Sequence, residues 1–368
     1  MAYRQYRGIG AYRRRRRAII AAVLVLLLLI IAALFAFGAG YLVFTENGLR
    51  FQAKPGGADV PPDVVIEPPV TAPPETTGQS TTEPAPTEPP VVQTNYTSAL
   101  LLDADRLTDS AYVESQLAVL ERYGMTSVAV HVKDKTGAVR IPCASPYAAG
   151  AVAEDAEQFQ AALDALRARD IELVAMVSAL RDNVVPRAFR ECATKTGDSL
   201  WLDREYITWL DPYQDVTRVY LTDLVVACRD AGFSEVLLYN FTFANLGKTD
   251  MITYQDSGVA KEDALSALAS SLRDATEGKL ALSVLLTGKT VTEGQDALAG
   301  QNAAKLCNAV NKVYLSMEKP EEALLASFAP DRPEDCRVAA YITGGQPLAA
   351  ADYPPLDYLV RTESYEYQ

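Results

Sequence analysis

The sequence predicts an α/β protein: a (β/α)8 barrel of the TIM type behind an N-terminal transmembrane helix and a disordered linker rich in Pro, Thr and Glu. Three observations lead to this prediction. Arginines precede a long uncharged apolar stretch, a proline-rich stretch follows it, and apolar runs of strand length then alternate with helical patterns. The chain therefore divides into a cytoplasmic basic tail (1–17), a membrane helix (18–44), a linker (45–97) and the barrel (98–368).

The N-terminal segment has an uneven charge distribution. The chain has 368 residues and a formal net charge of −13, yet seven of its 34 basic residues lie in the first 17 positions, and no acidic residue precedes Glu46. A bilayer is spanned by about 20 apolar residues, so the uncharged stretch 18–45 is long enough, and it exceeds the apolar core of a cleavable signal. The arginines should stay in the cytoplasm, which places the barrel outside the cell. We prefer this single-pass anchor to a twin-arginine export signal.

The linker differs from its neighbours in composition. Residues 46–97 contain 11 of the 21 prolines, together with many Thr and Glu. Such a segment cannot bury a core and should stay extended, because too little apolar surface is available to offset the entropy of ordering it. We expect a passive stalk that holds the barrel away from the membrane.

The barrel prediction depends on apolar runs of three or more residues, which are typical of strands that are covered on both faces. Eight such runs occur, at 99–103, 127–134, 171–180, 235–241, 279–286, 312–317, 337–343 and 357–361. Helical periodicity falls between them, for example over 113–120, 159–166 and 216–228. A doubly wound open sheet is the alternative, but no Gly-rich phosphate loop follows any of these runs. The eighth helix should be short or absent.

Composition argues against several functions. Beyond residue 17 the chain has 27 basic and 47 acidic residues, a net charge of −20, which repels nucleic acid. His131 is the single histidine, and the five cysteines form no CxxC or Cys/His cluster, so neither a metal site nor a cofactor is expected. Because five is odd, at least one cysteine lacks an intramolecular partner.

The carboxyl ends of barrel strands form the working face of this fold. Polar and aromatic side chains follow several of the eight runs, and both tryptophans fall in the long excursion after the third. From these we predict Glu318 and Asp134 as catalytic residues, and a substrate-binding set of Lys133, Arg181, Asp182, Trp209, Asp211, Tyr239 and Asn240.

Three of these residues have simpler alternatives, and His131 has a separate one. Trp209 either offers an apolar face to a sugar ring or packs its loop onto the barrel. Glu318 is either an acid or part of an acidic helix start, and Asp211 either binds substrate or caps a turn. His131 shares strand parity with Lys133, so both should face one side. There we expect a buried, neutral imidazole near the lysine rather than a catalytic base.

The motifs AVHVKDKTG, AMVSALRD, WLDPY and GFSEVLLYNF resemble those of a known family, the putative glycoside hydrolase barrel domains of secreted and membrane-anchored bacterial chains. Those domains read roughly V-I-D-V-K-D-x-x-G, A-R-I-x-x-F-K-D, W-V-D-P-Y and G-F-D-E-I-Q-F-D-Y-I-R-F-P. The resemblance covers residues 98–361. The matching residues are Lys133, Asp134, Gly137, Asp182, Trp209, Asp211, Pro212, Tyr213, Gly232, Phe233 and Glu235.

The departures from the family pattern concern its acids. His131 and Tyr239 stand where the pattern has Asp, Leu285 stands where the fifth strand should offer another, and Met176 replaces an Arg. The resemblance therefore implies a carbohydrate-active barrel, while the departures remove acids that a glycosidase needs.

Three functions follow from these observations. The first is a working glycosidase with relocated acids, and the second is an extracytoplasmic barrel that binds an envelope or extracellular polysaccharide without cleaving it efficiently. The third is a structural or partner-binding envelope protein. We favour the second, because Tyr and Asn at the end of the fourth strand can hydrogen-bond sugar hydroxyls but do not replace a carboxylic acid.

Overall fold

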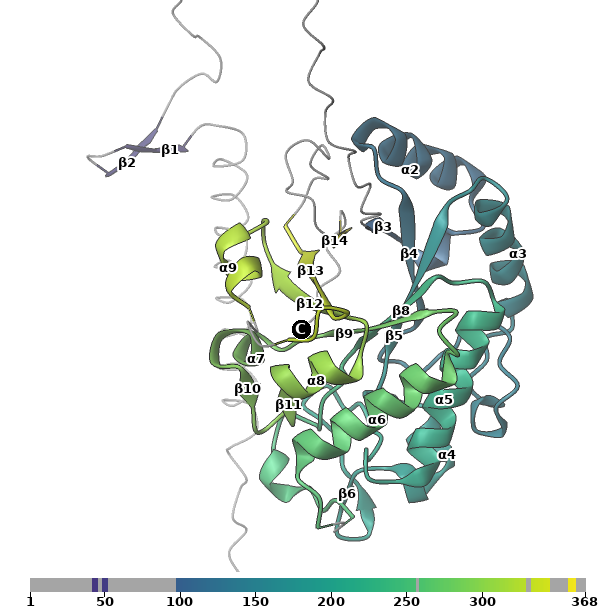
Figure 1. The fold of residues 1–368 in the computed structure, drawn as a ribbon, viewed down its shortest axis with the longest axis vertical. Helices are drawn as coiled ribbons and strands as arrows, with labels where there is room; N and C mark the ends of the chain where they lie inside the picture. Colours follow the sequence, from purple (N-terminus) through teal and green to yellow (C-terminus); the bar gives the residue numbers. More distant parts are fainter. Residues whose placement is uncertain are drawn as a thin grey trace, which may run out of the picture. The chain divides into compact units, whose positions relative to one another are not determined.

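The computed structural model describes residues 97–255, 258–328, 332–344 and 357–361, together with the backbone of 42–45 and 48–51. Eight parallel strands close into a barrel in the order β12-β13-β14-β3-β4-β5-β8-β9 (Figure 1). They are β3 (Ser98–Leu102), β4 (Ser127–Lys133), β5 (Glu172–Ser178), β8 (Glu235–Tyr239), β9 (Ala281–Leu285), β12 (Lys312–Met317), β13 (Arg337–Ile342) and β14 (Asp357–Arg361). Each corresponds to one of the eight predicted apolar runs, so the barrel prediction is confirmed.

Helices cover the outside of the barrel. The longer ones are α2 (Ser110–Tyr123), α3 (Ala156–Arg167), α5 (Asp215–Asp230) and α6 (Lys261–Ala275), each between two consecutive barrel strands. The short ones are α4 (Val185–Ala188), α7 (Gly288–Glu293), α8 (Ala303–Ala309) and α9 (Glu322–Ser327). Two small antiparallel pairs, β6 (Lys195–Thr196) with β7 (Ser199–Leu200) and β10 (Gln295–Asp296) with β11 (Gln301–Asn302), lie in the connections. The prediction that an eighth helix is short or absent concerns residues after β14, which lie outside the described residues.

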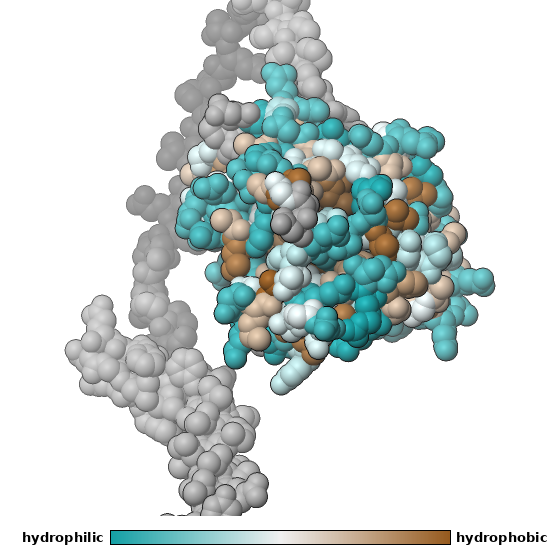
Figure 2. All heavy atoms as spheres, turned by 90° about the horizontal axis from the view of Figure 1, so that it is seen from below, coloured by the Kyte–Doolittle hydropathy of each residue, from teal (hydrophilic) through white to brown (hydrophobic). Residues whose placement is uncertain are grey.

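The apolar runs have two faces, and each face has its own core. Outward side chains such as Val128, Val236 and Leu282 pack against the helices. Inward ones such as Ala129 and Leu237 form a second cluster inside the barrel. Because both faces are buried, a barrel strand shows no polar alternation, which is why continuous apolar runs predicted it. On the face of the molecule that Figure 2 shows, hydrophilic residues predominate among the described ones, with hydrophobic residues in small groups between them.

The amino-terminal end of the barrel is closed by buried charges. Lys312 Nζ lies 2.7 Å from Glu235 Oε2 and 3.5 Å from Asp357 Oδ1, and all three side chains are less than 5 % exposed. Ser283 Oγ donates to the other oxygen of Glu235 at 2.6 Å, and Arg337 Nε lies 2.7 Å from Asp357 Oδ2. Lys312, Glu235 and Asp357 satisfy one another out of reach of water, and Arg337, whose side chain is 40 % exposed, pairs with Asp357 from the surface, so this end is a polar plug.

The N-terminal unit, residues 1–87, contains one described feature, an antiparallel pair of β1 (Leu42–Thr45) and β2 (Gly48–Phe51). The helix predicted over 18–44 is therefore wrong at its last three residues, which form part of β1. Residues 18–41 of that prediction, the basic tail and nearly all of the linker lie outside the described residues. Within the described part of the chain, no helix combines the length and the apolar character that a membrane crossing needs.

Candidate functional site at the barrel mouth

Lys133 and Asp182 form a buried ion pair where β4 and β5 end. Lys133 Nζ lies 3.0 Å from Asp182 Oδ2, neither side chain is exposed to solvent, and the ammonium also donates to the carbonyl of Ser178. The other oxygen of Asp182 accepts from the amides of Val184 and Val185 at 2.8 and 2.9 Å. Both residues were predicted to bind substrate. In the structure they instead hold the two strand ends together.

The structure explains why the motif after β4 has glycine at position 137. Its φ is +90°, a region that side chains disfavour, and a Cβ built there would lie 2.5 Å from Asp182 Oδ1 and 3.0 Å from the amide of Val184. The loop after β4 therefore packs directly on the loop after β5, and this contact depends on the absence of a side chain.

The predicted shared face of His131 and Lys133 is not observed. A register shift interrupts the pairing of β4 with β5 between these two residues. His131 points into the barrel, where its ring meets that of Tyr239 edge-on at 5.4 Å between centroids. Lys133 instead approaches the ring of Tyr220 on α5 at 5.9 Å. The extra residue of the bulge shifts the side chains that follow it to the opposite face of the sheet. Counting alternate positions along the sequence cannot reveal such an insertion.

Arg181 and Trp209 belong to a second buried network. Arg181 Nε and Trp209 Nε1 both donate to Asp203 Oδ2, at 2.8 and 3.0 Å, and Trp209 is 1 % exposed. Arg181 also lies 3.0 Å from Glu205 Oε2, which Lys135 approaches at 2.6 Å. Trp209 therefore packs its loop, as the simpler alternative held, and presents no open face. Trp201 is buried as well.

Asp211 has the turn-capping role. Its Oδ1 accepts from the amide of Tyr213 at 3.0 Å and its Oδ2 from the amide of Gln255 at 3.1 Å. Burial raises the pKa of this carboxyl, and the two backbone hydrogen bonds partly oppose the rise. Asp211 also lines a small pocket of about 280 Å³ with Lys195 and Tyr254. It joins the excursion 179–213 to the segment after β8.

Tyr239 and Asn240 occupy the end of β8, as predicted. Tyr239 is 3 % exposed and donates its hydroxyl to the carbonyl of Lys133 at 3.3 Å. Asn240 is half-buried, donates to Ser178 Oγ at 3.0 Å, and holds a left-handed φ of +50°. Asparagine adopts this conformation more readily than most side chains, because its short polar group can hydrogen-bond locally.

The floor of the mouth is completed by residues that sequence reasoning did not select. Tyr341 and Arg361 continue the inward positions of β13 and β14, and Ser316, opposite Tyr341 in register, is exposed. The charges of Asp134, Arg140, Arg361 and Asp103 influence the pKa of His131. The sequence carried a signal for Ser316 and Arg361, because both continue the inward parity of their runs.

Asp134 and Glu318, the predicted catalytic residues, stand on opposite walls. They follow β4 and β12, which are four strands apart in either direction around the barrel. Strands about 4.8 Å apart give eight of them a perimeter of roughly 38 Å, so the backbones of opposite walls are about 12 Å or more apart. Glu318 is exposed, and Asp134 commits Oδ1 to the amide and hydroxyl of Thr136.

His131 should make the fold sensitive to acid. Burial lowers its pKa to about 4, against an ordinary value of 6.5, while the carboxylate of Asp134 partly opposes the shift. His131 therefore binds a proton more weakly in the folded chain than in the unfolded chain. Its contribution to stability is complete above pH 6.5, and it is lost as the pH falls towards 4. When the pH is lowered from 7 to 4.5, the free energy of unfolding of His131→Phe should fall by about 2 kcal/mol less than that of the wild type. Chemical denaturation at the two pH values measures both decreases. Equal losses would exclude His131 as the group.

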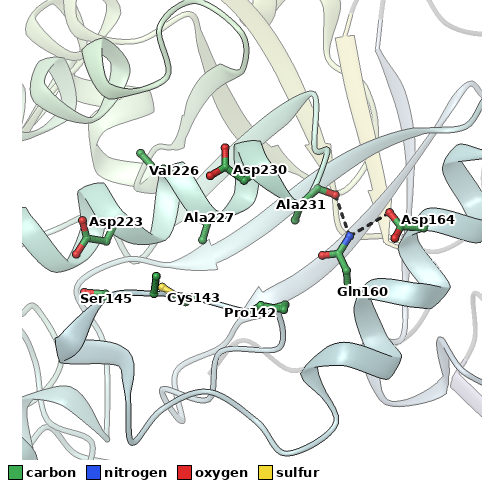
Figure 3. Close-up of a pocket in the computed structure, with 11 residues that line it drawn as sticks. Pro142, Cys143, Ser145, Gln160, Asp164, Asp223, Val226, Ala227, Asp230 and Ala231 are labelled. Carbon is green, nitrogen blue, oxygen red and sulfur yellow. Dashed lines mark hydrogen bonds between the residues drawn. The ribbon is translucent and has the colours of Figure 1, made fainter.

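Several cavities lie away from the mouth, and the groove between α3 and α5 is one of them. A groove of about 770 Å³ runs outside the barrel between the segment Pro142–Ser145, α3 and α5 (Figure 3). Figure 3 shows Gln160 at one end, where its amide donates to Asp164 Oδ1 and to the carbonyl of Ala231, both at 3.1 Å. No predicted site residue lines it. In the described part of the chain, no group of three His, Cys, Asp or Glu side chains gathers closely enough to hold a metal ion.

Comparison with solved structures finds likenesses at low identity. A hypothetical protein from Ruminiclostridium thermocellum ATCC 27405 is 21 % identical with a TM-score of 0.46, over 50 % of this chain and 96 % of that one. A cycloalternan-degrading enzyme from Trueperella pyogenes is 11 % identical with a TM-score of 0.49, over 74 % of this chain and 43 % of that one. A class V chitinase from Pseudomonas fluorescens Pf-5 is 13 % identical with a TM-score of 0.40, over 67 % and 68 %.

Comparison with curated proteins finds no match. One family model does match, over residues 99–327, and its description is "Putative glycosyl hydrolase domain". The match begins in β3, includes every strand up to β12 and ends with α9, so it covers more than half of the chain and all the motifs discussed above. The chain therefore belongs to this family of putative glycosyl hydrolase domains.

Proposed function

We propose that the barrel binds a cell-envelope or extracellular polysaccharide at its mouth and cleaves it poorly or not at all. The observation that carries the proposal is the composition of the mouth. The β8 end offers Tyr239 and Asn240 instead of a carboxylate, and the neighbouring inward position on β9 is Leu285. Hydroxyl and amide groups hydrogen-bond sugars, but they do not supply an acid near neutral pH.

The remaining carboxylates support the same reading. Glu318 stands across the barrel from Asp134, and one oxygen of Asp134 is already bound within its own turn. Asp103 and Asp134 follow adjacent strands but flank an imidazole that burial keeps neutral. The buried pairs around Lys133 and Arg181 would keep the loops in place, so that the mouth is preformed for binding.

The binding experiment uses the full chain and a panel of envelope polysaccharides. We expect saturable binding that Asn240→Ala weakens about 3- to 10-fold, since a net hydrogen bond contributes about 0.5–1.5 kcal/mol. The control Lys279→Ala, at an exposed site before the amino end of β9, should leave binding unchanged. Turnover is measured on the same glycans with Glu318→Gln and Asp134→Asn. Robust hydrolysis abolished by either variant would overturn the non-catalytic part of the proposal. Failure to bind any glycan would favour a structural or partner-binding protein.

We further propose that the chain is anchored by the apolar stretch within residues 18–44, with its N-terminus in the cytoplasm and the barrel outside. The support is the arginine-rich start and the uncharged run that follows it. Protease added to intact cells should release a soluble fragment that contains the barrel. A barrel that stays protected until the cells are lysed would show the opposite topology.

A further inference from the structure

Tyr206 occupies a position that normally requires glycine. The amide of Asp203 donates to the carbonyl of Ile207 and the amide of Tyr206 to the carbonyl of Asp203, both at 3.0 Å, so a tight reversal joins the two sides of this loop. Tyr206 is the last of the three residues in this reversal, and its φ is +63°. Three-residue reversals of this kind place glycine at the left-handed position, because a Cβ there is disfavoured.

The turn is held in this shape by the buried network beneath it. Asp203 Oδ1 accepts from the amides of Glu205 and Ile207 at 2.8 and 3.1 Å, while Oδ2 is fixed by Arg181 and Trp209. Arg187 donates to the carbonyl of Tyr206 at 3.1 Å. The loop therefore imposes the left-handed conformation on Tyr206 from both sides.

The side chain of Tyr206 makes few stabilising contacts with the rest of the fold. It is 75 % exposed, more than any other large hydrophobic residue that the structure describes. Within the described residues, neither a hydrogen bond nor a ring contact involves its phenol. A strained backbone that presents an unburied aromatic ring is not explained by packing, and strain of this kind points to a function.

The turn is tied to the rim of the mouth. Glu205, the residue before Tyr206, lies 2.6 Å from Lys135 Nζ and 3.0 Å from Arg181 Nη2. Lys135 directly follows Asp134 at the end of β4. The strained tyrosine is therefore fixed beside the loop that carries Asp134, on the face where parallel strands end.

We propose that Tyr206 is a stacking residue for the polysaccharide, against which a pyranose ring places its apolar C–H face at the rim of the mouth. This inference rests on the proposed function and replaces Trp209 as the sugar platform. The phenol ring is amphipathic and preoriented by its turn, so little conformational entropy is lost when a sugar packs against it.

The test compares three variants of the full chain for thermal stability and for binding of the glycan selected by the panel. Tyr206→Gly should raise Tm by about 2–4 °C, because glycine relieves the left-handed strain, and should weaken binding about 3- to 10-fold. Tyr206→Phe should bind within about 2-fold of wild type, because the ring face remains. Leu298→Ala, at an exposed hydrophobic site on the connection between β10 and β11, is the control and should change neither quantity.

The outcomes separate the inference from the proposed function. If wild type binds and Tyr206→Gly binds equally well, Tyr206 is not a platform, while the mouth remains a glycan site. A lower Tm for Tyr206→Gly would show that the side chain stabilises the fold and would also overturn the inference. If wild type binds no glycan, the proposed function fails and the inference with it.

Discussion

Replacing Lys312 with methionine should lower the free energy of unfolding of the barrel by about 3–5 kcal/mol, because it leaves two buried carboxylates without their shared cation. Lys312 Nζ lies 2.7 Å from Glu235 Oε2 and 3.5 Å from Asp357 Oδ1. Asp357 keeps Arg337 at 2.7 Å, so Glu235 is destabilised most, although it keeps the hydrogen bond from Ser283 Oγ. Methionine approximates the length of the lysine stem, so the loss is electrostatic rather than a cavity.

Chemical denaturation of residues 88–368 measures this effect, since they form a compact unit with their own core. The matched control is Lys289→Met, which removes an exposed pair with Glu293 at 3.7 Å and should change stability by less than about 0.5 kcal/mol. The double variant Lys312→Met with Glu235→Gln should recover part of the loss. If Lys312→Met costs less than about 1 kcal/mol, the plug is not a dry ion-pair network.

Lys133→Met should cause a loss of similar size at the opposite end, about 3–5 kcal/mol. Asp182 would keep the amides of Val184 and Val185 but lose its only ion-pair partner among the described residues, and its side chain is fully buried. The carbonyl of Ser178 would lose a donor as well. Unlike the plug, this pair fixes the loops at the mouth, so Lys133→Met should also weaken glycan binding.

Two measurements check this prediction. Denaturation gives the loss of stability, and Lys133→Met combined with Asp182→Asn should restore some of it, because the amide leaves no buried charge. Glycan binding by the folded variant reports on the loops. Full stability in Lys133→Met would show that water reaches Asp182, whereas a large loss with unchanged binding would limit the pair to a structural role.

The strands could be predicted because their physical signature is local. A strand buried on both faces must be apolar at consecutive positions, and such runs are visible at 235–241 and 312–317 without knowledge of their neighbours. The N-terminal end of β1 shows the limit of this signal. An apolar stretch predicted helix through residue 44, whereas Leu42–Thr45 pair with Gly48–Phe51 in an antiparallel register.

The roles of the site residues were harder to predict, because a polar side chain at a strand end has two possible fates. Lys133, Arg181 and Asp182 carry the charges expected of sugar ligands, yet each is buried against an oppositely charged group. Which fate applies depends on a partner far along the chain, such as Asp203 for Arg181. The sequence contains no local sign of that pairing.

Two irregularities of the backbone could not be predicted from sequence patterns. The bulge after His131 turns Lys133 away from the barrel interior, and no composition rule locates such an insertion in a run of seven buried residues. Tyr206 was missed because the requirement for a left-handed residue appears only once the turn Asp203–Ile207 is seen.

The polar plug also determines how the barrel would bear a mechanical load. Thr97, the first residue described ahead of β3, gives its amide to Asp357 Oδ1 at 2.6 Å, accepts from the amide of Tyr358 at 2.9 Å, and lies 3.4 Å from Lys312 Nζ through its hydroxyl. A pull transmitted along the preceding chain would draw β3 lengthwise past β14, so their hydrogen bonds would be loaded together in shear instead of opening one after another. The force would enter at the plug, and the mouth at the far end of the strands would be the last part to feel it.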